Sequence, residues 1–75
     1  MYRQEEFQQA LELFRQAAEQ GDAWAQINLA QMYRDGEGVE INYQLALYWF
    51  SQSASLGNME AKQQKQKLLN HLAEK

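Results

Sequence analysis

The chain has 75 residues and a net charge of −3, with one His, no Cys and no Pro. A chain of this length forms one small domain at most, and without Cys neither a disulfide nor a thiolate metal site can stabilise it. The acidic balance argues against a nucleic-acid-binding protein, which needs a basic face, and one His is too few for a multi-histidine metal site. We expect neither a metal nor a cofactor.

Four helices are predicted, because apolar residues recur at intervals of three and four along most of the chain. No segment alternates convincingly with the period of two that a half-buried strand shows. The absence of Pro leaves long helices uninterrupted. The expected bounds of the helices are residues 3–20, 22–35, 42–56 and 58–74.

Each of the first three helices carries an apolar stripe that we interpret as core. The stripe of the first helix consists of Phe7, Ala10, Leu11, Phe14, Ala17 and Ala18. The stripe of the second consists of Ala25, Leu29, Met32 and Tyr33, and that of the third of Tyr43, Ala46, Leu47, Phe50 and Ala54. We expect the second and third stripes to close a helical hairpin.

The link between the second and third helices has the chemistry of a tight turn. Gly36 and Gly38 suit the positive φ values that follow a helix end. Val39 and Ile41 offer apolar side chains to the end of the hairpin, and Asn42 is predicted to cap the third helix by accepting a backbone N–H.

Similar signals mark the other helix ends. Gly21 and Gly57 are expected to end the first and third helices. Asp22 and Asn58 follow them as predicted caps of the second and fourth helices.

The chain matches itself when it is shifted by 36 residues. The matched pairs are Ala10 with Ala46, Leu11 with Leu47, Phe14 with Phe50, Ala18 with Ala54, Gly21 with Gly57, and Ala25 with Ala61. This period indicates an array of helical hairpins, in which each hairpin buries its stripe against its neighbours. After Ala61 the match decays, and the last helix is apolar on one face with Gln and Lys elsewhere, as is typical of a terminal helix.

We therefore predict a single repeat domain over residues 1–75. In this interpretation residues 1–21 are the second helix of a partial repeat, residues 22–57 are one full repeat, and residues 58–75 form a C-terminal capping helix.

The segment from Ala25 to Gly57 resembles one Sel1-like repeat, a close relative of the tetratricopeptide repeat. The resemblance rests on Ala25, Leu29, Tyr33, Gly36, Glu37, Gly38, Val39, Asn42, Ala46, Trp49, Phe50, Ala54 and Gly57, and it continues as half a repeat over residues 6–25. The chain departs from the family pattern at Ala30, Asn42 and Ser53, where Gly, Asp and Ala are usual. The resemblance implies an all-α fold, a short right-handed α-solenoid of antiparallel helix hairpins. It also implies protein–protein adaptor work and no catalytic residues.

The resemblance further implies a groove lined by the helix over residues 22–35, because the first helix of each hairpin lines the concave side of such solenoids. The predicted partner contacts lie away from the expected hairpin stripe; they are Trp24, Ile27, Asn28, Gln31 and Arg34. Trp and Arg commonly anchor interfaces. The alternative for Trp24 is packing against a helix of the same chain.

The N-terminal end is a second candidate surface. The first helix matches the second helix of a hairpin, so its outer side, with Tyr2 and Leu13, lacks the usual partner. Burial in so short a chain barely offsets conformational entropy, and a homodimer through this end is therefore a hypothesis. The net charge is −4 over residues 1–37 and +1 over residues 38–75. This asymmetry suits either a weak attraction between chains or an ordinary solvated surface.

Two functions remain open, a module that binds a peptide or partner protein and an oligomerisation unit without a separate ligand. An enzyme is not expected, because Ser51, Ser53 and Ser55 have no base at a recognisable spacing and the lone His71 suits a solvated helix C-terminus. No secretory signal and no membrane-spanning run is visible. We expect a cytoplasmic location, although a fragment of an exported chain would look the same.

Overall fold

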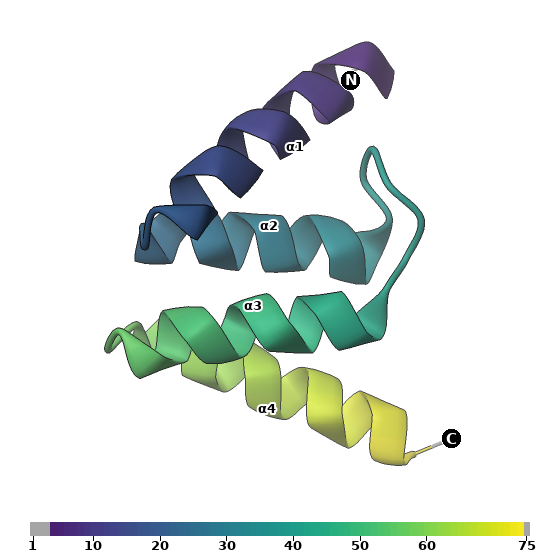
Figure 1. Ribbon diagram of the computed structural model, residues 1–75. Coiled ribbons are helices and arrows are strands. Elements are labelled where there is room, and N and C mark those ends of the chain that lie inside the picture. Colours follow the sequence, from purple (N-terminus) through teal and green to yellow (C-terminus); the bar gives the residue numbers. More distant parts are fainter. Residues whose placement is uncertain (1–3, 75) are drawn as a thin grey trace.

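The computed structural model describes residues 4–74, and this part of the chain consists of four α-helices joined by short links (Figure 1). Their bounds are α1 Gln4–Glu19, α2 Ala23–Asp35, α3 Tyr43–Ser55 and α4 Met59–Ala73. The described residues contain no strand, which confirms the all-α prediction. The predicted helix start at residue 3, the candidate surface residue Tyr2 and the last residue of the chain lie outside the described residues.

The helices stack in the order of the chain. α1 packs against α2, α2 against α3, and α3 against α4. Figure 1 shows that successive helices run in opposite directions and that α1 diverges from α2 toward its N-terminal end. This row of antiparallel helices is the solenoid-like arrangement that the sequence predicts. Within the described part, no helix has the length and apolar character needed to cross a bilayer.

Side-chain caps begin three of the helices, as predicted. The carboxylate of Asp22 accepts hydrogen bonds from the backbone N–H groups of the first turn of α2, at 2.9 and 3.1 Å. Asn42 accepts from the Leu45 N–H at 3.0 Å, and Asn58 accepts from the Ala61 N–H at 3.2 Å. These caps satisfy N–H groups that have no partner within the helix.

The turn after α2 is held by close contacts that require glycine. Gly36 and Gly38 both have positive φ values, 74° and 75°. A Cβ atom at Gly36 would lie 2.8 Å from Cγ1 of Ile41, and a Cβ atom at Gly38 would lie 2.7 Å from Cβ of Phe7. The link between α2 and α3 therefore also touches α1, so it positions the N-terminal helix.

The helix α2 is buried on two faces, and this corrects one expectation. Ala25 and Leu29, which we expected to close the hairpin, form a cluster with Ala18 of α1, and Trp49 of α3 also packs against this cluster. The residues that face α3 and α4 are Ile27 and Ala30, which join a core with Phe50. Because α2 lies between two helices, both faces carry apolar side chains.

Candidate partner-binding groove

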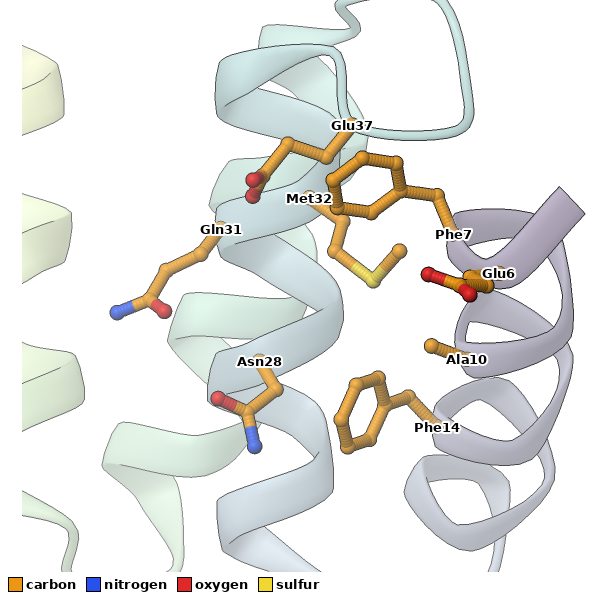
Figure 2. Close-up of a pocket in the computed structure, with 8 residues that line it drawn as sticks. All are labelled: Glu6, Phe7, Ala10, Phe14, Asn28, Gln31, Met32 and Glu37. Carbon is orange, nitrogen blue, oxygen red and sulfur yellow. The ribbon is translucent and has the colours of Figure 1, made fainter. Parts of the chain in front are cut away.

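An open groove of about 440 Å³ lies between α1 and α2. Its lining consists of Glu6, Phe7, Ala10 and Phe14 from α1, Asn28, Gln31 and Met32 from α2, and Glu37 from the turn. Figure 2 shows the two phenyl rings pointing from α1 toward α2, with the Met32 side chain reaching back between them. The groove thus combines an apolar floor with carboxylate and amide groups around it.

The groove is open because α1 and α3 have different surroundings. α3 packs between α2 and α4, whereas the main contacts of α1 are with α2. Ala46 and Phe50 of α3 are both 0% exposed. Ala10 and Phe14, which precede them by 36 residues, remain partly exposed. Equivalent apolar residues are therefore covered on α3 and accessible on α1.

The five predicted partner contacts have different surroundings in the structure. Asn28 and Gln31 line the groove between α1 and α2. Ile27 does not fit the prediction, because its side chain is 2% exposed and belongs to the core beneath α3 and α4. Trp24 and Arg34 line two other hollows of the surface, and the joint role of these residues in partner binding stays a prediction.

Arg34 has intramolecular partners. Its guanidinium donates hydrogen bonds to the carboxylate of Asp35 at 2.9 and 3.0 Å, and to Oε1 of Gln64 at 2.8 Å. Its Cζ lies 5.8 Å from the centre of the Phe50 ring, within cation–π range. The hydrogen bond to Asp35 raises the pKa of Arg34 above its ordinary value, although partial burial opposes this. Arg34 therefore links α2 to α3 and α4.

Trp24 is 66% exposed, so the alternative that it packs against a helix of the same chain is wrong, and its role as a partner contact stays a prediction. It lines a shallow depression of about 450 Å³ together with Leu56 and Met59, two further exposed apolar side chains. This patch lies where α2 begins and where α3 passes into α4. The patch and the groove share no lining residue.

Sequence reasoning missed most of the groove. Phe7, Ala10 and Phe14 were assigned to the core, and Met32 was placed in the hairpin stripe. A comparison of residues that match over 36 positions could have shown that these side chains are accessible. The matching residues of α3 are covered by α2 and α4, whereas α1 has its main contacts with α2 among the described residues.

The groove has the chemistry of a binding surface. Its floor offers aromatic and aliphatic area, and its amide and carboxylate groups offer hydrogen-bond acceptors and negative charge. Among residues 4–74, no three His, Asp or Glu side chains form a group that could hold a metal ion.

A row of antiparallel helices with a 36-residue repeat defines an all-helical repeat protein. The family model of the Sel1 repeat matches residues 4–22 and 25–58. This chain belongs to the Sel1 repeat family, as the resemblance predicted. Sel1 repeats are generally protein–protein interaction modules and are typically non-catalytic. Comparison with curated proteins found no match, and comparison with solved structures found none either.

Proposed function

We propose that this protein binds a partner protein by taking a helical segment of it into the groove between α1 and α2. The observation that carries the proposal is the partial exposure of Ala10 and Phe14, whose counterparts in α3 are fully buried. An apolar centre with a polar margin is the usual anatomy of a protein interface. An amphipathic helix in an apolar groove is a recurrent mode of recognition.

The proposal keeps α2 as a partner-binding helix, but with fewer contact residues than the sequence predicts. Asn28 and Gln31 contribute to the groove, whereas Ile27 and Arg34 serve the fold. The proposed role needs no catalytic residue. We also propose that the protein is located in the cytoplasm, because a chain without Cys suits a reducing compartment.

Two matched charge substitutions on α1 test this function. Ala10→Glu places a carboxylate in the groove, whereas Gln9→Glu places one on the exposed side of the same helix. In affinity capture from lysate, we expect proteins retained by the wild type to be retained by Gln9→Glu and lost with Ala10→Glu. Circular-dichroism melts of both variants verify that each is folded. Equal capture by both variants would contradict the proposal.

A Trp24→Ala variant distinguishes the groove from the exposed patch. Because Trp24 lines no part of the groove, we expect this variant to retain the same proteins as the wild type. Loss of capture with Trp24→Ala and retention with Ala10→Glu would move the binding site to the patch around Leu56 and Met59.

Self-association through α1 is the second candidate, and one observation favours it. Leu13 of α1 is 67% exposed and does not line the groove, so it offers a further apolar contact on the same helix. A homodimer would bury Leu13 and would gain stability with concentration. Light scattering at high micromolar concentration should then give twice the mass of one chain, and Leu13→Gln should halve it. A mass of one chain for the wild type removes this candidate.

A further inference from the structure

The chain contains a counterpart of its groove, and this counterpart is covered on one side by a helix. A second pocket, of about 340 Å³, lies among α2, α3 and α4. Four residues that line it follow four residues of the groove by 36 positions. The pairs are Phe7 with Tyr43, Asn28 with Gln64, Gln31 with Lys67, and Met32 with Leu68. The two sites are therefore equivalent positions of successive repeats.

Besides these side-chain differences, the counterpart has a helix along one side of it. That helix is α2, and it contributes Arg34 and Asp35 to the lining. At the groove the equivalent helix is absent from the described residues, and the space is larger. α2 therefore serves as a template for the helix that would fit the groove.

The template shows which side chains such a helix needs. Ile27 and Ala30 of α2 share one core with Ala46 and Phe50 of α3, which are fully buried as a result. Ala30 and Ala46 are small, and this lets the two helices approach closely. The guanidinium of Arg34 lies over the Phe50 ring and donates a hydrogen bond to Gln64. These three side chains of α2 occur at spacings of three and four along one face.

We propose that the groove selects a partner-protein helix with a large aliphatic residue, an alanine three positions later and an arginine four positions after that. This inference rests on the proposed function and specifies its ligand. The aliphatic residue and the alanine pack on Ala10 and Phe14. The arginine lies over the Phe14 ring and donates a hydrogen bond to the side-chain amide of Asn28, the counterpart of Gln64.

The charge of the groove suits a basic helix. Glu6 and Glu37 both line it, and no Lys or Arg does so among the described residues. A cation brought into this site meets the carboxylate of Glu37 and the face of an aromatic ring, and both contacts are favourable. The same carboxylate would repel an acidic helix.

The sequence pattern also argues for a different protein rather than a second copy. The equivalent positions of α4 hold Gln63, Gln66 and Asn70, which supply neither the apolar residues nor the cation. In α2 of a second copy, Ile27 and Ala30 are buried within its own core.

The probe for this inference is a synthetic peptide with the sequence of residues 22–37, capped at both ends. Leu29 and Met32 are replaced by Gln in the peptide, so that it retains the face with Ile27, Ala30 and Arg34 but cannot replace α2 in the fold. A matched peptide carries Arg34→Glu in addition. Binding of each peptide to the full chain is measured by isothermal titration calorimetry.

We expect the first peptide to bind, and the Arg34→Glu peptide to bind at least about tenfold more weakly, as loss of a charge-assisted hydrogen bond predicts. We expect Ala10→Glu in the protein to abolish binding. Glu37→Lys in the protein should reverse the preference between the two peptides. Because Glu37 is an exposed turn residue, this substitution leaves the core intact.

The outcomes separate this inference from the proposed function. Equal affinity of the two peptides overturns the arginine requirement, and no binding of the first peptide overturns the whole pattern. In either case the capture experiment with Ala10→Glu and Gln9→Glu still decides the function. Equal binding of the first peptide to wild type and Ala10→Glu overturns the location. A dimer in light scattering that Ala10→Glu dissociates would show that a second copy occupies the groove instead.

Discussion

The hydroxyl of Ser53 donates a hydrogen bond to the carbonyl oxygen of Ala23, and the two oxygen atoms are 2.7 Å apart. The bond joins the last turn of α3 to the first turn of α2. Ser53 is fully buried, and it stands where the family usually has Ala. A small side chain fits this helix contact, and the hydroxyl adds a link between the two helices of the hairpin.

Ser53→Ala tests the strength of this link. We expect the free energy of unfolding to fall by about 0.5–1.5 kcal/mol, the usual net value of one hydrogen bond. Urea denaturation followed by circular dichroism measures it. Ser55→Ala, on the exposed side of the same turn, is the control and should change stability by less than about 0.5 kcal/mol. Equal stability of the two variants would show that the hydroxyl contributes nothing.

Gly38→Ala should destabilise the protein more than Gly57→Ala. Both glycines have positive φ values, 75° and 95°, so either substitution costs about 1–2 kcal/mol of backbone strain. Only at Gly38 would the new Cβ meet another segment, at 2.7 Å from Cβ of Phe7. We expect a further loss of about 1–3 kcal/mol from this overpacking. Hydrogen exchange should show the extra loss in α1; protection of α1 that is the same in both variants would contradict the contact.

Ile27 and Trp24 lie on one helix and should respond oppositely to truncation. Ile27→Ala removes a core side chain and should cost about 2–5 kcal/mol of unfolding free energy. Trp24→Ala removes an exposed side chain and should change stability by about 0.5 kcal/mol or less. Denaturant titrations of the two variants measure both effects. A larger loss for Trp24→Ala would mean that Trp24 is buried in solution.

Gln26→Glu should make stability depend on pH. Gln26 is 4% exposed, and its Nε2 donates a hydrogen bond to the Ala18 carbonyl oxygen at 3.0 Å. Its Oε1 has no hydrogen-bond partner among the described residues. A carboxylate here would be buried beside a carbonyl oxygen, so burial would raise the pKa of the new Glu in the folded state. The variant should therefore approach wild-type stability at low pH.

The loss should grow as pH rises above the pKa of an unfolded Glu, because the folded state then holds the proton more tightly than the unfolded state does. We expect the variant to be roughly 2–4 kcal/mol less stable than wild type at pH 7. Urea titrations at pH 4 and pH 7 measure the change. Gln20→Glu, at an exposed position nearby, is the control and should show little pH-dependent loss of stability. A loss that is independent of pH would show that the carboxylate reaches solvent.

The helices and their ends were predictable because their causes are local. The stripe over Phe7–Ala18 and the caps at Asp22, Asn42 and Asn58 each act within a few residues along the chain. All three caps form the expected hydrogen bonds. The Gly36 turn likewise follows from backbone geometry that is confined to a few residues.

The binding surface was less predictable because α2 has two buried faces. Periodicity identified Ala25 and Leu29 as core but could not say which neighbour they meet. Ile27 was placed in a groove because it lies off that stripe, and the structure places it in the second core instead. A helix between two neighbours shows no single apolar stripe, so its pattern does not distinguish a core face from a binding face.

The amino-acid sequence by itself determined the four helices, their caps and glycine turns, and the 36-residue repeat, because these depend on side-chain chemistry and backbone freedom within short segments. Only the tertiary structure decided which apolar residues stay accessible. Phe14 and Phe50 are the same residue type at equivalent positions, yet one lines an open groove and the other is fully buried. The difference arises because α3 is covered from both sides by α2 and α4, whereas α1 packs mainly on α2, and the number of neighbours of a helix is a property of the whole stack.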